Sequence, residues 1–140
     1  MKSHSFLYEF GHDLADSFAD NGILDSPRVL VQVYSAIQKR DHIATILAEI
    51  RSILPSAIIT GATTNAAIHA GRIHEEATII SVCEFESSQV SLIHGDYAND
   101  RITDFRSFGQ VLGEKSAHCD TKLLLCYAAG DKLNAEDLAR

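Results

Sequence analysis

The sequence predicts an α/β fold with a mixed β-sheet, built from strand-helix-strand units and an antiparallel hairpin. The segment Arg28–Ser35 alternates in polarity and is rich in valine, as expected of a central strand. Isoleucine and leucine residues between positions 43 and 54 then recur three and four apart, which is the spacing of one helix face. The short apolar run Ala57–Thr60 follows as a second strand. If these two strands are parallel, their crossover should be right-handed.

Local signals indicate where these elements begin and end. Asp41 is expected to cap the first of the helices after Arg28–Ser35, because its carboxylate can accept from free backbone N–H groups. Pro55 should stop that helix, and Gly61 should end the strand that follows it. Asp104 is expected to cap a further helix with apolar residues three and four apart.

Three more segments complete the predicted sheet. Ile79–Phe85 and Gln89–His94 are separated by a short polar turn, which favours an antiparallel hairpin. Lys122–Tyr127 is an almost unbroken apolar run and is expected to lie inside the sheet, together with Arg28–Ser35 and Ala57–Thr60.

The first 27 residues allow two interpretations. Four apolar side chains lie four apart, which suits one face of a helix: Phe6, Phe10, Leu14 and Phe18. The segment SFLYEF alone could equally form a strand.

Composition narrows the class of protein. The 140 residues are 46% hydrophobic and 22% charged, which predicts one globular domain over residues 1–140. The net charge of -7 and the scattered basic residues argue against nucleic-acid binding and against adsorption to anionic lipid. The first residues contain no apolar segment long enough for a signal peptide or a membrane span, so we expect a cytoplasmic domain without membrane insertion.

The sequence offers no motif for a cofactor or a metal. It lacks a Walker lysine and a GxGxxG fingerprint. No two histidines share one helical face at ligand spacing, and the three cysteines match no zinc pattern. The cysteines are therefore expected to be reduced structural thiols.

One loop stands out because small and polar residues gather after an apolar strand. Gly61 allows close approach of a ligand to the backbone, and three polar side chains could bind a carboxylate or another polar group: Thr63, Thr64 and Asn65. We expect the loop to line a concave surface with its N–H groups pointing outward. Ala66 and Ala67 should then open a helix or a tight turn. The alternative is that these side chains satisfy only the backbone of the loop.

Two further residues are candidates for ligand binding. Ser35 ends the first predicted strand, and Asp96 follows Gln89–His94, where it could accept from an amine or could simply be a turn aspartate. A small hydrolase using Ser35 and His94 is the least favoured alternative, because no GxSxG elbow is present. No catalytic residue is assigned.

The order of three segments resembles the N-terminal part of a FIST domain, a sensory domain found often in bacterial signalling proteins. The segments are VLVQVYS, IATILAEIRSILPSAIITGATT and ATIISVCEF, and the resemblance spans 27–127. Ala66-Ala67 stands where the family usually has Gly-Glu, whereas Ile68 and Gly71 are in place. The departure removes a plausible contact for a ligand amine.

The resemblance implies that the chain senses a small ligand such as an amino acid. It also implies a covalently linked output domain, such as a diguanylate cyclase, a phosphodiesterase or a chemotaxis receptor, which this chain does not include. A helix that starts near Asn134 is expected to continue beyond Arg140 in the natural polypeptide, so the chain would be an incomplete sensory domain. The main alternative is an assembly module that forms a homodimer and binds no small ligand.

Overall fold

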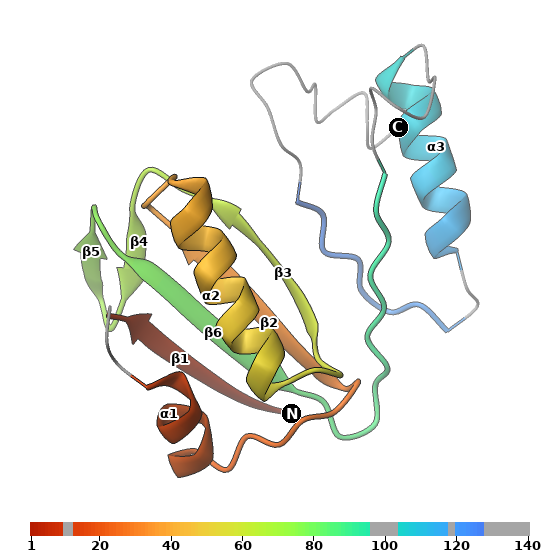
Figure 1. Cartoon of the computed structure of the whole chain (residues 1–140). Helices are drawn as coiled ribbons and strands as arrows, with labels where there is room; N and C mark the ends of the chain where they lie inside the picture. Colours follow the sequence, from red (N-terminus) through yellow and green to blue (C-terminus); the bar gives the residue numbers. More distant parts are fainter. Residues whose placement is uncertain (10–12, 96–103, 118–119, 128–140) are drawn as a thin grey trace. The chain divides into compact units, whose positions relative to one another are not determined.

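The computed structural model describes residues 1–9, 13–95, 104–117 and 120–127 (Figure 1). The chain divides into two compact units, Met1–Ser91 and Leu92–Arg140, and each is described by itself. The Asn134 helix, Asp96 and Cys119 lie outside the described residues.

The first unit is built on a four-stranded mixed sheet, in the order β1-β6-β2-β3. The strands are β1 (Lys2–Tyr8), β2 (Val29–Ser35), β3 (Ile58–Thr63) and β6 (Thr78–Glu84). β2 runs parallel to β3 and antiparallel to β6, and β1 runs antiparallel to β6. The predicted α/β class with a mixed sheet is therefore confirmed.

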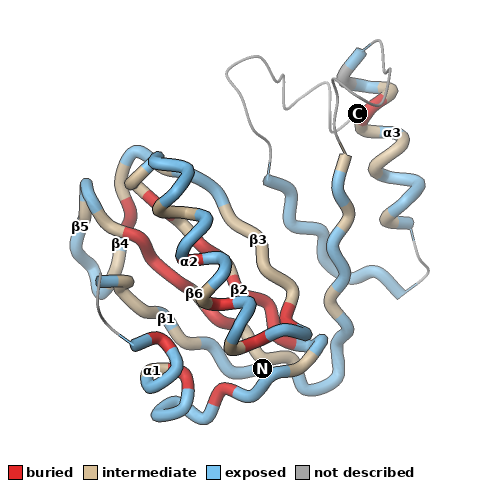
Figure 2. Tube along the Cα trace, viewed as in Figure 1, coloured by how far each residue is buried: buried red, intermediate tan, exposed pale blue. Residues whose placement is uncertain are grey.

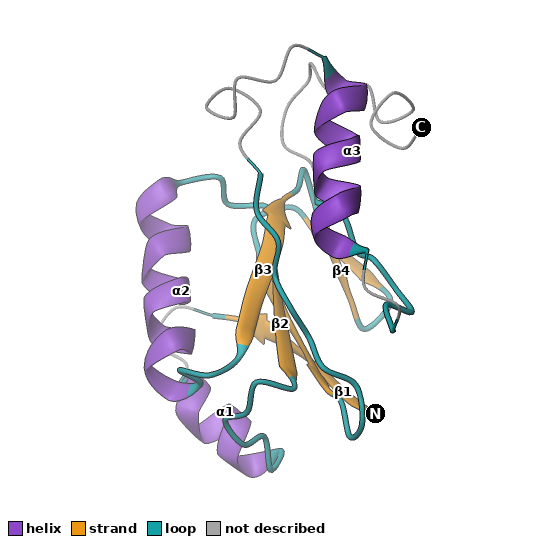
Figure 3. Ribbon diagram, turned by 90° about the vertical axis from the view of Figure 1, so that its right-hand side faces the viewer, coloured by secondary structure: helices purple, strands orange, loops and turns teal. Residues whose placement is uncertain are grey.

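Two helices cover one face of this sheet (Figure 3): α1 (Leu14–Asp20) and α2 (Arg40–Ile53). Alternate residues of β2 and β6 point into the core that forms there, and Figure 2 shows the buried positions concentrated along these strands. The core joins these strand residues to α1 and α2 through Phe18, Ile46 and Ile50, which are at most 1% exposed. Each such side chain contributes roughly 1.5–3 kcal/mol through burial.

The two interpretations of the N-terminal residues each hold for one part of the segment. Residues 2–8 form β1, and the helix begins at Leu14, where Asp13 accepts a hydrogen bond from the Ala15 N–H. Phe18 belongs to the helix and is 1% exposed, whereas Phe6 belongs to the strand and packs against the core.

Two helix boundaries are confirmed and one predicted cap is wrong. α2 ends at Ile53, before Pro55. The second unit contains α3 (Phe105–Ser116), and Asp104 caps it by accepting from the Ser107 N–H. Asp41 does not cap α2, because the helix already begins at Arg40 and Asp41 lies within its first turn.

The predicted hairpin of Ile79–Phe85 with Gln89–His94 is wrong, because both edges of β6 are occupied by other strands. Seven residues of β6 pair with β1 on one side and seven pair with β2 on the other. No edge remains for residues 89–94, which form no strand.

Two expectations about interior strands are also wrong. Of Ala57–Thr60, only residues 58–60 belong to β3, and β3 is an edge strand of the described sheet. Lys122–Tyr127 forms no strand, and its leucines Leu123, Leu124 and Leu125 are 73%, 56% and 54% exposed. A strand needs partner strands for its backbone hydrogen bonds, and an apolar run alone does not supply them.

Gly61 does not end β3, and Ala66-Ala67 does not open a helix. β3 continues through Gly61 to Thr63. A separate two-stranded antiparallel sheet follows, formed by β4 (Ala67–His69) and β5 (Arg72–His74). Its two-residue turn, Ala70-Gly71, has positive φ at both positions (48° and 75°), as a type I′ hairpin turn requires.

The parallel pairing of β2 with β3 depends on the missing side chain of Gly61. Gly61 lies opposite Val33, has φ +155°, and a Cβ there would overlap the Val33 carbonyl oxygen. Gly61→Ala should therefore lower the free energy of unfolding by about 3 kcal/mol or more, through strained backbone and lost β2–β3 contact. Urea unfolding followed by circular dichroism measures this loss.

Gly22→Ala is the matched control. Gly22 also has positive φ (+67°), but nothing lies within 4 Å of the position that a Cβ would take there. This variant should lose only about 1 kcal/mol, the cost of the backbone conformation alone. Equal losses in the two variants would show that the approach to Val33 is not the constraint.

Candidate functional site: a pocket at the carboxyl end of β2

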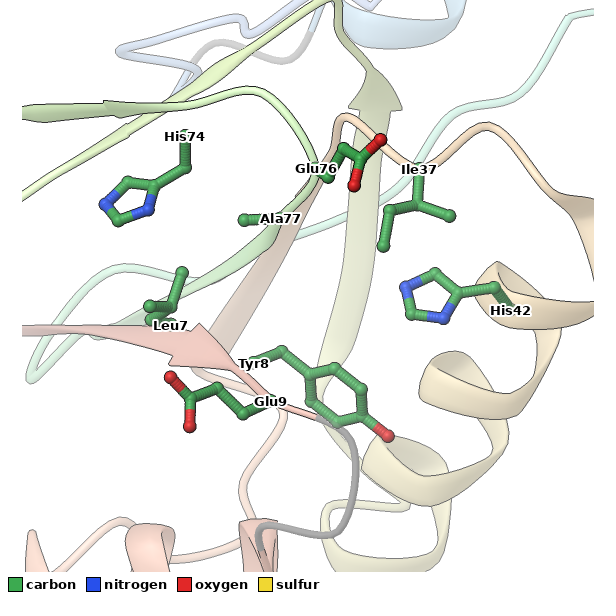
Figure 4. A pocket seen from close by; sticks show the side chains of 8 residues that line it. All are labelled: Leu7, Tyr8, Glu9, Ile37, His42, His74, Glu76 and Ala77. Atoms are coloured by element: carbon green, nitrogen blue, oxygen red, sulfur yellow. The ribbon is translucent and has the colours of Figure 1, made fainter.

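The first unit has a pocket of about 420 Å³ beside the ends of β1 and β2 (Figure 4). Its lining comes from the end of β1, the connection after β2, the first turn of α2, and the segment from β5 to β6: Leu7, Tyr8, Glu9, Ile37, His42, His74, Glu76 and Ala77. Ligands of open α/β sheets bind beyond the carboxyl ends of strands. Pockets for small ligands span roughly 300–1,000 Å³.

Ser35, the last residue of β2, fixes the backbone that enters the pocket. Its hydroxyl accepts from the Ile37 N–H at 3.2 Å and donates to the Ile37 carbonyl at 2.8 Å. The Ala36 N–H donates to the Ala77 carbonyl at 2.9 Å, which joins the two walls that carry Ile37 and Ala77. The position of Ile37 is therefore set by hydrogen bonds at the end of the sheet.

A chain of side-chain hydrogen bonds runs from this turn to His42. The Ser35 hydroxyl lies 2.8 Å from the Thr78 hydroxyl, and His42 Nε2 lies 3.1 Å from the same Thr78 oxygen. Ser35 and Thr78 are 2% and 1% exposed. Buried hydroxyls need such partners, and the partners in turn orient the His42 ring at the pocket wall.

Tyr8 contacts the His42 ring and is held in place by Glu49. Its hydroxyl donates to Glu49 Oε2 at 2.9 Å, and its ring meets the His42 ring edge-on with centroids 6.0 Å apart. Burial raises the pKa of Tyr8, and the hydrogen bond and charge of Glu49 raise it further. Tyr8 is therefore a neutral wall residue whose proton is already engaged.

The β4–β5 hairpin supplies His74. His69 and His74 have ring centroids 6.5 Å apart, and His69 Nδ1 lies 3.1 Å from the Ser5 hydroxyl of β1. The outward pair Ile68 and Ile73 is 71% exposed at each residue. The hairpin thus turns its histidines toward the body of the unit.

The residues predicted from the loop do not line this pocket. Gly61 and Thr63 belong to β3, and Thr64 and Asn65 follow it. The Thr64 N–H does not point outward as expected, because it donates to the Ser35 carbonyl at 2.8 Å. The Thr64 hydroxyl oxygen is buried and has no hydrogen-bond partner among the described residues. Whether the loop contacts a ligand stays a prediction.

The pocket was missed because its walls are far apart in the sequence. Ser35 was predicted as a ligand-binding residue. It does not line the pocket, but its hydroxyl forms hydrogen bonds to the Ile37 carbonyl and to the Thr78 hydroxyl. His42 could have been found from its place at the start of the helix after the first strand of a strand-helix-strand unit. No local signal places Tyr8 beside it. In the described ranges, no three His, Cys, Asp or Glu residues are placed to hold a metal ion.

The structure thus defines an α/β domain with a ligand-sized pocket at a strand end. The family model of the FIST N domain matches residues 29–140, and the chain belongs to this family of sensory domains of signal-transduction proteins. Comparison with curated proteins and with solved structures found no match. Within the described residues, no helix has the length and apolar character needed to cross a membrane.

The same substitution, threonine to valine, should lower stability at Thr78 and not at Thr64. Thr78→Val removes a hydroxyl bonded to both Ser35 and His42, and we expect it to cost about 1–3 kcal/mol of unfolding free energy. Thr64→Val removes a buried hydroxyl without a partner among the described residues. It should leave stability unchanged or raise it by up to about 1 kcal/mol. Denaturant unfolding of both variants measures the difference, and a loss at Thr64 would show that its hydroxyl is bonded.

The Tyr8 hydroxyl should make stability fall at alkaline pH. Its folded pKa lies above the ordinary value of 10.0, so the folded state binds its proton more tightly than the unfolded state. The resulting stabilisation is complete below pH 10.0 and is lost as the pH rises through the folded pKa. The stability difference between the wild type and Tyr8→Phe should shrink over that range, as measured by urea unfolding.

Glu49→Gln tests the cause of this shift. The variant should lower the Tyr8 pKa only part of the way, because burial is the larger cause and remains. Ultraviolet titration of tyrosinate, with Tyr8→Phe to assign the signal, measures it. An unchanged Tyr8 pKa in Glu49→Gln would contradict the role of Glu49.

Proposed function

We propose that this domain is a cytoplasmic small-ligand sensor and that its ligand occupies the pocket beside His42. The pocket carries the proposal, because it has the size of a small-ligand site and lies at the carboxyl end of β2. Buried hydrogen bonds hold its polar walls before any ligand arrives, and such preorganisation reduces the entropy lost on binding.

The signal would arise from a shift between conformations. A ligand favours whichever arrangement it binds better, and only by its difference in affinity. The pocket walls come from β1, the β2–α2 connection, α2 and the β5–β6 segment, so one bound molecule would contact all four. The change would pass to a covalently linked output domain, such as a diguanylate cyclase, a phosphodiesterase or a chemotaxis receptor, through the segment from Asn134.

Amino acids and related metabolites are the first ligands to test. The loop Gly61–Asn65 and, separately, Asp96 remain further proposed ligand contacts. No catalytic step belongs to the proposal, and the Ser35 hydroxyl is buried and already donates to the Ile37 carbonyl.

A thermal-shift screen of amino acids, amines and other small metabolites tests the proposal. A ligand at about 100 times its dissociation constant should add roughly 2.7 kcal/mol to the free energy of unfolding. Ala77→Leu should abolish the shift, because Ala77 lines the pocket and a larger side chain would fill it. Ala44→Leu, the same change at an exposed position of α2, should retain it.

The assembly module is the outcome that would contradict the proposal. A flat screen together with a concentration-dependent dimer in sedimentation experiments would assign the chain to that class. A ligand whose thermal shift is lost in Thr64→Val and retained in Ala77→Leu would place the site at the loop instead of the pocket.

A further inference from the structure

We propose that the pocket selects a small organic ammonium cation and disfavours the matching zwitterionic amino acid. This inference rests on the proposed function and concerns the same site. It follows from the charge of the lining, the direction of the hydrogen bonds behind it, and the apolar surface beside them.

The charges of the lining have one sign. The carboxylates of Glu9 and Glu76 come from two different chain segments, because Glu9 directly follows β1 and Glu76 lies in the β5–β6 connection. No lysine or arginine is among the described residues that line the pocket. A bound carboxylate would therefore lose its hydration without meeting a permanent positive charge, whereas an ammonium group would meet negative ones.

The hydrogen-bond chain determines which nitrogen of His42 carries a proton. The Ser35 proton goes to the Ile37 carbonyl, which can only accept. The bond between Ser35 and Thr78 must then use the Thr78 proton, so Thr78 can only accept from His42. His42 therefore donates from Nε2, and this assignment satisfies every bond in the chain.

Neutral His42 consequently has its lone pair on Nδ1. That nitrogen has no hydrogen-bond partner among the described residues, and the ring lines the pocket. Figure 4 shows the ring extending from α2 into the space between Ile37 and Tyr8. Nδ1 can thus accept a hydrogen bond from a ligand N–H.

Tyr8 also favours a cationic ligand. Its O–H is donated to Glu49, so it offers a ligand an aromatic ring and an oxygen lone pair. An aromatic ring attracts a cation placed over its face. His74 can donate or accept, and it adds no charge when neutral.

The apolar lining indicates that the rest of the ligand is a hydrocarbon chain. Leu7, Ile37 and Ala77 provide aliphatic surface beside the acceptors. The matching molecule has an ammonium group on a short hydrocarbon chain. We therefore choose n-pentylamine as the probe, with norleucine, which is the same molecule bearing a carboxylate, and pentanoate, which bears a carboxylate and no amine.

Titration of the ¹⁵N-labelled chain with the three probes tests the inference. Pentylamine should shift the amide signals of Ile37, His42 and Ala77, with a dissociation constant about tenfold below those of norleucine and pentanoate. Equal or tighter binding of norleucine or pentanoate at these residues would overturn the ammonium preference while leaving the sensor proposal intact. No pentylamine binding, or shifts confined to other residues, would overturn it as well. A flat metabolite screen would reject the sensor proposal itself.

Two neighbouring glutamates provide the matched control. Glu75 and Glu76 are both exposed in the turn after β5, and only Glu76 lines the pocket. Glu76→Gln should weaken pentylamine binding about tenfold, whereas Glu75→Gln, which changes the net charge equally, should change it by less than about twofold. Equal effects would mean that the acidic protein merely attracts cations, and would overturn the inference.

The His42 tautomer can be observed directly. Long-range ¹H–¹⁵N spectra of the neutral ring should show the proton on Nε2, and Thr78→Val should reduce that preference because it removes the acceptor. A proton on Nδ1 in the wild-type protein would overturn the argument from the hydrogen-bond chain.

Discussion

The pairing of β6 on both of its edges is the constraint on which the first unit depends. Seven consecutive residues of β6 bond to β1 on one side and to β2 on the other. This strand therefore joins the first residues of the chain to the strand-helix-strand unit formed by β2, α2 and β3. It also places the start of β6 between the ends of β1 and β2, so Thr78 reaches both Ser35 and His42. The sheet, the core and the pocket therefore all depend on the pairing of β6 with both β1 and β2.

Local features of the fold could be predicted from the sequence, and long-range partners could not. Alternating polarity identified β2, helical spacing identified α2, and Asp104 identified a cap, because each depends on residues close in sequence. The partners of β6 are strands from distant parts of the sequence, and nothing near β6 identifies them. The short turn after β6 instead favoured a hairpin with the segment that follows it. The exposed leucines of Lys122–Tyr127 show the same limit, since an apolar run indicates a need for burial without naming the surface that provides it.

In the candidate site, too, local features could be predicted from the sequence and long-range contacts could not. Ser35 was recognised because it ends a strand, and its role proved to be support for the pocket wall. Tyr8, His42 and Ala77 come together only through the sheet, and no spacing in the sequence relates them. Nothing in the sequence indicated which nitrogen of His42 can accept a hydrogen bond at the pocket wall. That assignment follows from the order in which buried protons are shared between Ser35, Thr78 and His42, which requires the distances between them.

The family match begins at Val29, yet three of the eight residues that line the pocket, Leu7, Tyr8 and Glu9, precede it. The framework common to the family and the segment that completes the cavity are thus different parts of the chain. Under the proposed function, substitutions at Leu7, Tyr8 or Glu9 would change the chemistry of the ligand site and leave the sequence that the family model matches unaltered. If the pocket is the ligand site, the family match alone does not identify the ligand, because part of the lining lies outside the matched residues.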